Sequence, residues 1–482
     1  MNLQGTLFQS FDGSGRTPRN VQVQVLRWVE ERMLEPRLAI QAPCGVGKAA
    51  IAKAIQQVTG AAIVTPNNLL LEQYRESYPD MNYLKGIAHY ECKQHEVTCD
   101  EVRSARLKPC DGCPYKTCRS KAVSGEPTVY NPISMFYSGV KQRAVVVDEA
   151  HQLVGMIKLL TSQTFAKPTY SWPSSLEPKE MAAWLLSISN MHRTAAQLAF
   201  TNGKSKEGVK HAARSDRLKF TYDQITGGVP VVWYTEWRES RGKKVEVLVV
   251  EPVGTPRTLL DRLFGEATKI VLMSGTLPPS WAGEIFGTDK FAYLDVPSPI
   301  PKENRRVVVK PAGLTAGSNP EEIARWAEAQ IKQYGGPAIL HTTYKMGAQI
   351  AKFVPNALLH TPDTKLSTMQ RFKQEGGLWI AAGCSEGVDL PGSQARLNLI
   401  PVLPFSDARS PAIVALKNMS GGVRRYKLET VVDFIQQVGR TTRSTDDWSV
   451  TVCGDQRIFG LVSELRKELP ASFVESLTME RA

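Results

Sequence analysis

Short runs of β-branched and apolar residues recur along this sequence, and each run is closed by a turn signal or by polar residues. Runs of this length are typical of buried parallel strands in α/β domains when helical stretches separate them. The clearest runs are AAIVTP at 61–66, AVVVDEAH at 144–151, KIVLMSGT at 269–276, AILHTT at 338–343, LWIAAG at 378–383 and VTVCGD at 450–455. We therefore predict an α/β protein built on parallel sheets.

The predicted strands form two groups, which indicates two α/β domains. A chain of 482 residues is too long for one ordinary core, and the Pro-rich stretch at 296–306 has the composition of a linker. A Cys-rich stretch and a longer, polar and helical stretch interrupt the first group. The predicted boundaries are 1–85, 126–154 and 244–295 for the first α/β domain, 86–125 for the Cys-rich insertion, 155–243 for the helical insertion and 296–482 for the second α/β domain.

The segment APCGVGKAA at 42–50 stands between an apolar run and a helical pattern. Glycines at such a point let backbone N–H groups surround phosphate oxygens at a helix N-terminus, and a Lys neutralises their charge. The position after the Lys ordinarily holds a Ser or Thr that ligates Mg²⁺, but here it is Ala. A Gly-rich turn before a structural helix is the alternative interpretation. The predicted nucleotide-binding residues are Pro43, Cys44, Gly45, Val46, Gly47, Lys48 and Ala49.

A second candidate element is DEAH at 148–151, which ends a run of three valines. A carboxylate pair at the carboxyl edge of a parallel strand is where a nucleotide site is expected. Asp148 would hold Mg²⁺ and Glu149 would orient or deprotonate the attacking water, with His151 assigned to the same catalytic set. An acidic turn followed by a helix N-cap is the alternative.

The sequence QQVGRTTR at 436–443 precedes the last predicted strand and is predicted to be helical. Arginines three residues apart on a helix share one face, and planar guanidinium groups suit the γ-phosphate of a nucleotide across a domain cleft. We predict catalytic roles for Gln436, Arg440 and Arg443. A solvated basic face with an ion pair to Asp433 or Asp446 is the alternative.

Taken in order, these motifs resemble those of the XPD/DinG family of superfamily 2 helicases. The other matching segments are RNVQ at 19–22, TPNNLLLEQ at 65–73, SGTL at 274–277, EGVDLPG at 386–392 and GDQRIF at 454–459. The resemblance implies two RecA-like domains with ATP between them, a small Arch-like insertion at 155–243 and 5′ to 3′ translocation on single-stranded DNA.

The resemblance also implies roles for individual residues. Gln22 would contact adenine, and Thr65 and Asn67 would touch the nucleic-acid backbone. The segment that contains Glu386, Gly387 and Asp389 would couple the two motor domains to the nucleotide and the nucleic-acid strand.

Five of the eight cysteines lie in the Cys-rich insertion, a clustering that favours a metal site in a reducing compartment. Its position in the chain resembles the iron–sulfur insertion of the family, so we predict a [4Fe–4S] cluster. Cys99 could replace Cys92 or Cys118. A structural zinc site, in which His95 could take the place of one thiolate, is the alternative. The predicted ligands are Cys92, Cys110, Cys113 and Cys118.

The chain is basic, with 59 Lys and Arg against 47 Asp and Glu, which suits a polyanionic partner. We expect single-stranded DNA and forked duplex DNA as partners. Tyr90 is a candidate for a ring that stacks on unpaired bases as a wedge. A basic stripe along a helix, or alternatively a solvated helix face, is formed by Lys206, Lys210 and Arg214. No secretion signal or run of 18 apolar residues is present. We expect a soluble, intracellular motor that acts as a monomer and does not contact a membrane, in a bacterium or a virus-infected cell. The sequence does not identify any protein partner.

Two other functions fit the same motifs. Ala49 in the phosphate loop fits a clamp or recruited subunit that binds ATP and DNA with little hydrolysis. An RNA or hybrid helicase also fits, because such motors hold the backbone more than the bases.

Overall fold

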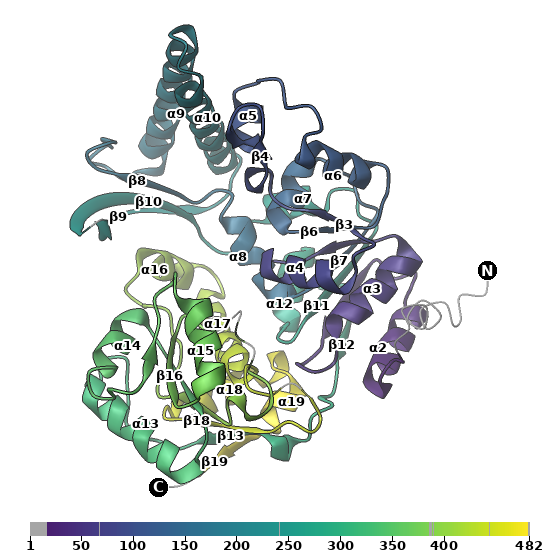
Figure 1. Cartoon of the computed structure of the whole chain (residues 1–482), viewed down its shortest axis with the longest axis vertical. Coiled ribbons are helices and arrows are strands. Elements are labelled where there is room, and N and C mark those ends of the chain that lie inside the picture. Colours follow the sequence, from purple (N-terminus) through teal and green to yellow (C-terminus); the bar gives the residue numbers. More distant parts are fainter. Residues whose placement is uncertain are drawn as a thin grey trace.

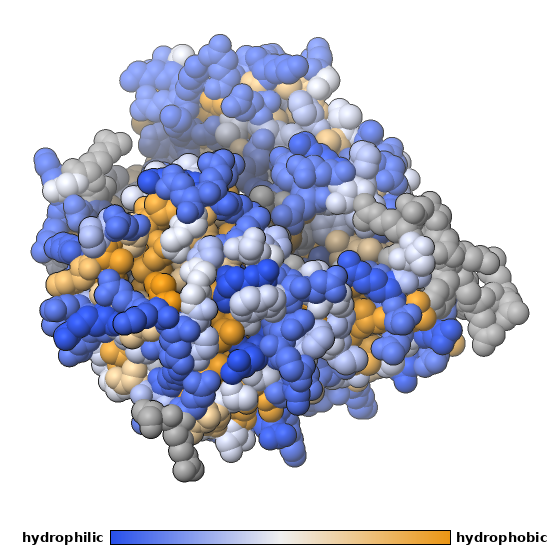
Figure 2. Space-filling model, turned by 60° about the horizontal axis from the view of Figure 1, so that its bottom comes forward, coloured by the Kyte–Doolittle hydropathy of each residue, from blue (hydrophilic) through white to orange (hydrophobic). Residues whose placement is uncertain are grey.

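The computed structural model describes residues 17–66, 68–240, 242–384, 388, 390–442 and 444–480. Two α/β domains lie one beside the other, and a helical hairpin projects from the first of them (Figure 1). Both termini of the described chain lie on the α/β domains rather than on the hairpin (Figure 1). Polar residues dominate the face drawn in Figure 2, and apolar residues gather between them in smaller areas. None of the described helices combines the length and the apolar character needed to cross a membrane.

The first domain is built on a seven-stranded parallel sheet with the order β12-β1-β11-β7-β2-β6-β3. Its strands are β1 (Arg37–Gln41), β2 (Ala62–Val64), β3 (Asn82–Leu84), β6 (Thr128–Tyr130), β7 (Ala144–Val147), β11 (Lys269–Ser274) and β12 (Ala292–Asp295). Its helices are α2 (Asn20–Glu31), α3 (Lys48–Thr59), α4 (Asn68–Ser77), α7 (Pro132–Ser138), η2 (Ala150–Gln152), α8 (Leu153–Lys158), α11 (Arg257–Phe264) and α12 (Pro279–Phe286).

The second domain repeats this architecture, with the strand order β15-β16-β14-β17-β18-β13-β19 and every pair parallel. Its strands are β13 (Arg305–Val309), β14 (Ala338–Thr342), β15 (Leu358–Leu359), β16 (Leu378–Ala382), β17 (Leu397–Ile400), β18 (Ser449–Cys453) and β19 (Leu477–Met479). Its helices are η3 (Lys302–Asn304), α13 (Pro320–Tyr334), α14 (Tyr344–Ile350), α15 (Lys365–Glu375), η4 (Gly392–Gln394), α16 (Pro411–Asn418), α17 (Gly422–Val438), α18 (Arg457–Leu465), η5 (Arg466–Glu468) and α19 (Ala471–Val474).

The central strands are apolar on both faces because each sheet is covered on both sides. In β7, Val145 and Val147 belong to one core cluster, whereas Val146 belongs to the cluster on the opposite face. Strand side chains alternate between the faces of a sheet, so an uninterrupted apolar run is what a doubly covered strand requires. The predicted α/β class and the six predicted strands are confirmed.

The Cys-rich segment leaves the first sheet after β3 and returns at β6. It contains η1 (Ile87–His89), the antiparallel pair β4 (Glu91–Cys92) and β5 (Val97–Thr98), and the helices α5 (Cys99–Ser104) and α6 (Pro114–Val123). Thr98 begins α5 with a capping box in which its hydroxyl accepts from Glu101 N and the Glu101 carboxylate accepts from Thr98 N.

The second insertion consists of the helical hairpin and a three-stranded antiparallel sheet with the order β8-β10-β9 (Figure 1). Two long helices pack against one another in the hairpin, and the sheet packs against them at its base. The elements are β8 (Gln163–Ala166), α9 (Pro178–Thr201), α10 (Ser205–Thr226), β9 (Val231–Ser240) and β10 (Lys243–Pro252).

The structure differs from the predicted end of this insertion at residue 243. The predicted boundary places the run at 245–250 in the first α/β domain, but β10 pairs with β9 along its whole length and with β8 over Val247–Val250. The insertion therefore continues to Pro252, and the apolar run faces the hairpin core, where Leu248 and Val250 pack with Phe165. An apolar run identifies a buried strand but does not say which sheet it joins.

Candidate active site

The segment 42–47 turns from β1 into α3 as the sequence predicts. Gly45 has φ +85° and Gly47 has φ +83°, backbone conformations that favour glycine. Gly47 is the N-cap of α3, which begins at Lys48. The loop therefore ends at a helix N-terminus, where backbone N–H groups are available to an anion.

Residues of α2 lie directly against this loop. Arg19 Nη1 donates to the Gly45 carbonyl at 2.5 Å, and the Gln22 side-chain oxygen accepts from the Arg19 backbone N–H at 2.8 Å. A Cβ at Gly47 would lie 2.5 Å from Gln22 Nε2. Gln22 is thus packed over the loop, and a side chain at position 47 would displace it.

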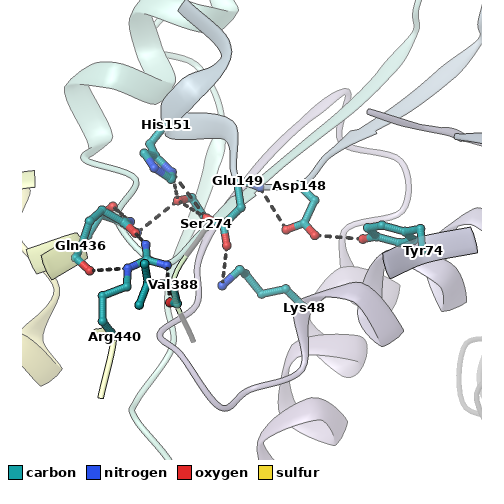
Figure 3. Close-up of polar contacts among 10 residues, drawn as sticks. Lys48, Tyr74, Asp148, Glu149, His151, Ser274, Val388, Gln436 and Arg440 are labelled. Atoms are coloured by element: carbon teal, nitrogen blue, oxygen red, sulfur yellow. Dashed lines mark hydrogen bonds and ion pairs between the residues drawn. The ribbon is translucent and has the colours of Figure 1, made fainter. Parts of the chain in front are cut away.

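Lys48 forms an ion pair with the second carboxylate of the DEAH segment, that of Glu149. Its ammonium lies 3.1 Å from Glu149 Oε1 (Figure 3). Burial alone would lower the pKa of Lys48, but Glu149, Cys44 and Asp148 raise it above its ordinary value. The Lys is therefore charged and paired within the protein.

Asp148 is buried at the carboxyl end of β7 and has two donors. Its Oδ1 accepts from the Glu149 backbone N–H at 3.0 Å, and its Oδ2 accepts from the Tyr74 hydroxyl at 2.9 Å. Burial, and then the neighbouring Glu149, raise the pKa of Asp148 to about 6. Burial and the contact with Asp148 raise the pKa of Tyr74 well above its ordinary value, so its hydroxyl is a donor.

Glu149 adopts φ +50°, which is uncommon for a residue other than glycine and is concentrated at functional sites. Its carboxylate lies between Lys48, His151 Nδ1 at 3.4 Å and the Ser274 hydroxyl at 3.3 Å. His151 Nδ1 also lies 2.7 Å from that hydroxyl. Burial would raise the pKa of Glu149, but Lys48 and His151 outweigh it and hold this pKa well below its ordinary value.

Two residues of the second domain reach across to this site from the side opposite Tyr74 (Figure 3). Gln436 Nε2 donates to Thr276 Oγ1 at 2.6 Å, and Arg440 Nη2 donates to Gln436 Oε1 at 2.8 Å. Arg440 also donates to the Val388 carbonyl at 3.4 Å. Gln436 thus joins the segment after β11 to the arginine.

The predicted helix over 436–443 is only partly present. Helix α17 ends at Val438 with Gly439 as its C-cap, so Arg440 lies beyond the helix. The prediction that the arginines share a helical face is wrong for Arg440, because the helix ends two residues before it. Arg440 instead folds back on the last turn, where its Nε donates to the Gln436 carbonyl at 2.9 Å.

The two domains are close together at the phosphate loop. A cavity of about 90 Å³ between them is lined by Pro43, Cys44, Thr276, Gln436 and Gly439, among others. Pockets for small molecules usually measure roughly 300–1,000 Å³. A Cβ at Gly439 would lie 3.3 Å from Cys44 Sγ. A nucleotide can enter this cleft only if the domains move apart or the loop rearranges.

Several predicted site residues lie outside the described residues. They are Asn67, Glu386, Gly387, Asp389 and Arg443.

The Cys-rich segment brings four buried thiols near one another, and this group contains Cys99 in place of the predicted Cys118. Cys92, Cys99, Cys110 and Cys113 are all buried, and Cys99 Sγ lies 3.7 Å from Cys113 Sγ. Cys92 and Cys110 interact with each other through their side chains. Cys118 is half-buried on α6, where it interacts with the Tyr90 hydroxyl.

A cavity of about 420 Å³ lies beside these thiols. Cys92, Cys99 and Cys113 line it, and so do four cationic side chains. Thiolates and cations around one cavity fit an anionic cluster with soft sulfur ligands. In the described part of the chain, no three His, Cys, Asp or Glu side chains are arranged to hold a single metal ion. The four cationic side chains that line the cavity are Arg103, Arg106, Lys116 and Arg119.

The side chains predicted to touch nucleic acid differ in exposure: the Thr65 hydroxyl is buried with no hydrogen-bond partner among the described residues, whereas the Lys206 side chain is 65% exposed. Thr65 is fully buried, and Tyr90 is half-buried with its hydroxyl bonded to Lys85 N and the Tyr83 carbonyl. In the predicted basic stripe, Lys206 pairs with Glu96 at 2.9 Å and Arg214 donates to Gln163 at 2.8 Å. Lys206 and Arg214 therefore link α10 to the Cys-rich segment and to β8.

Sequence reasoning missed three contributors to the site. Ser274 and Thr276 belong to the SGT segment, whose position was informative although neither residue was selected. Tyr74 had no local signal, because its contact with Asp148 joins positions 74 residues apart.

Comparison with known proteins relates this geometry to helicases. Residues 331–476 match the helicase C-terminal domain family. A curated protein of Methanocaldococcus jannaschii, named a probable ATP-dependent helicase, is 22% identical over 219 residues, which are 38% of this chain and 33% of that protein. The chain thus matches about a third of the length of this relative.

Two solved structures share the fold over nearly the whole chain. An apo XPD structure has a TM-score of 0.63 at 13% identity and covers 96% of this chain and 100% of its own. Xpd4 of S. tokodaii has a TM-score of 0.58 at 12% identity, with the same coverage of both chains. The two α/β domains are therefore RecA-like.

Proposed function

We propose that this chain, an XPD/DinG-like superfamily 2 helicase, hydrolyses ATP between its two RecA-like domains and moves 5′ to 3′ on single-stranded DNA, opening forked duplex DNA. One observation carries the proposal. Glu149 is held between Lys48 of the phosphate loop and Ser274, while Gln436 of the other domain bonds to Thr276 beside it. Residues from both domains thus meet beside one carboxylate, an arrangement that fits ATP hydrolysis and that a static binding protein would not need.

The residues have distinct roles in this proposal. When ATP binds, Lys48 exchanges the Glu149 carboxylate for the phosphates, and the released carboxylate orients and deprotonates the attacking water. Asp148 would hold Mg²⁺, which would neutralise phosphate charge. Arg440, together with Arg443, would contact the γ-phosphate once the cleft has rearranged. Hydrolysis would remove that contact and let the domains separate.

ATP hydrolysis by anaerobically purified protein, with and without single-stranded DNA, tests the proposal. We expect strong stimulation by DNA and its loss in Lys48→Ala, because that Lys neutralises the phosphates. Comparing DNA with RNA of the same sequence, and forks with 5′ or 3′ tails, tests substrate and polarity. No turnover with DNA binding intact, and turnover appearing in Ala49→Thr, would instead establish the clamp.

Replacing Arg440 by Ala is expected to reduce ATP turnover by about 10³-fold or more, which is what an arginine at the γ-phosphate contributes. ATP affinity should change far less, because the loop and Lys48 remain. Steady-state hydrolysis and nucleotide binding measure the two effects. Arg409→Ala is the control, since Arg409 is exposed and pairs only locally with Asp407. An equal loss of affinity and turnover would contradict a role at the γ-phosphate.

We also propose a [4Fe–4S] cluster in the Cys-rich segment, with Cys99 rather than Cys118 as a ligand. Burial and mutual contact of Cys92, Cys99, Cys110 and Cys113 support this set. A segment as small as this gains much of its stability from a bound metal. A structural zinc site with the same thiols is the alternative.

A further inference from the structure

The phosphate loop of this chain lacks one of the two side chains that ordinarily hold Mg²⁺. P-loop NTPases use the loop Ser or Thr and the Asp at the end of the following strand. Here position 49 is Ala, and it packs against the apolar cluster on the α3 face of the first sheet. Asp148 therefore remains as the one side chain of that pair, and its orientation matters more than in a site with both.

A hydroxyl reaches Asp148 from a different element. Tyr74 lies on α4, is 2% exposed and belongs to the same apolar cluster as Ala49. Its hydroxyl donates to Asp148 Oδ2 at 2.9 Å, and the Glu149 backbone N–H donates to Oδ1 at 3.0 Å. Each carboxylate oxygen thus has one fixed donor. A carboxylate accepts at about four positions, so lone pairs remain for a cation or its waters.

The tyrosine is itself held in place. Its ring packs against Tyr78 with centroids 6.1 Å apart, and its carbonyl accepts from the Tyr83 hydroxyl at 2.9 Å. Asp148 is fixed in turn by its backbone N–H, which donates to the Val64 carbonyl at 2.8 Å. Contacts from two elements, α4 and β2, therefore set the direction of the carboxylate.

The geometry points to Tyr74 as a positioning residue that holds the Asp148 carboxylate ready for Mg²⁺ and so offsets the missing hydroxyl at position 49. The inference rests on the proposed function, because it assumes a Mg²⁺–nucleotide complex in this loop. Partners that orient a metal ligand usually contribute roughly 10- to 100-fold to metal affinity. A loop with its own hydroxyl would depend less on such a partner.

Binding of a fluorescent ADP, N-methylanthraniloyl-ADP, tests this without relying on turnover. The affinity for this nucleotide is measured at increasing Mg²⁺ concentrations and, separately, in EDTA. The wild type is compared with Tyr74→Phe, which removes only the hydroxyl. We expect the half-saturating Mg²⁺ concentration to rise about tenfold or more in Tyr74→Phe, with the affinity in EDTA unchanged. Tyr78→Phe, in the neighbouring ring of the cluster, should behave like the wild type.

The Ala49→Ser background completes the test. With a loop hydroxyl restored, Tyr74→Phe should raise the Mg²⁺ requirement only about two- to threefold, since the two hydroxyls are not additive when they serve one ion. An equal loss of affinity with and without Mg²⁺, or an undiminished effect of Tyr74→Phe in Ala49→Ser, would overturn the inference. Failure of the wild type to bind the nucleotide under any condition would instead refute the proposed function.

Discussion

The Glu149→Gln variant is expected to bind ATP at least as tightly as the wild type and to hydrolyse it roughly 10² to 10⁴ times more slowly, the range that a positioned general base contributes. Gln keeps the size of the side chain and one acceptor oxygen but cannot accept a proton from water. The rate should fall while the fold and the loop persist.

The expected affinity follows from the pairing of Lys48. Its ammonium lies 3.1 Å from Glu149 Oε1, so ATP must compete with a carboxylate for it. Removing the negative charge ends that competition, and ATP affinity should hold or increase. The Lys48→Ala variant provides the contrast, because it should lose both affinity and turnover.

Single-turnover hydrolysis and equilibrium nucleotide binding, measured on both variants with single-stranded DNA present, separate these effects. Thermal unfolding checks that Glu149→Gln remains folded, which matters because residue 149 has a positive φ. If Glu149→Gln retained most of the wild-type rate, another group would have to activate the water.

The elements of this fold that could be predicted are those whose signal is local. The run around Val146 is apolar at every position because β7 is covered on both faces, so strand and sheet type could be read from composition alone. Gly45 and Gly47 mark a loop that requires positive φ, and both have it. These signals depend on the backbone or on burial and do not need the rest of the chain.

Features that depend on contacts between distant segments could not be predicted. Helix α17 ends at Val438, with Gly439 as its C-cap, although the pattern of apolar residues on both sides is compatible with a longer helix. The run at 245–250 is apolar in either sheet, and only pairing with β8 and β9 decides its place. Tyr74 is one aromatic residue in an amphipathic helix until the fold brings Asp148 to its hydroxyl.

The cysteines show the same limit and give the second large expected effect. Spacing alone does not distinguish Cys99 from Cys118, since either completes a set of four with Cys92, Cys110 and Cys113. In the fold, Cys99 is the first residue of α5 and its Sγ lies 3.7 Å from Cys113 Sγ. Cys118 lies one turn into α6 with a half-buried side chain, beside the Tyr90 hydroxyl.

We therefore expect Cys99→Ser, purified anaerobically, to lose most of its iron, acid-labile sulfide and visible absorption, whereas Cys118→Ser should retain about four iron atoms per chain, as a [4Fe–4S] site requires. Loss of the cluster should also unfold its segment, because a small loop-rich insertion has little core of its own. Limited proteolysis between β3 and β6 measures this independently of helicase activity.

The two serine variants serve as controls for each other, because both remove one thiol from the same segment. Iron retained in Cys99→Ser and lost in Cys118→Ser would instead support the set predicted from the sequence, in which Cys118 is the fourth ligand. Zinc in place of iron, in a colourless wild type purified without oxygen, would establish the structural zinc site instead. If the wild type holds iron and only Cys99→Ser loses it, Cys99 is a ligand and Cys118 is not. Burial in the folded segment would then identify the ligands better than the intervals between cysteines do, because a ligand must face the cluster whatever its distance along the chain.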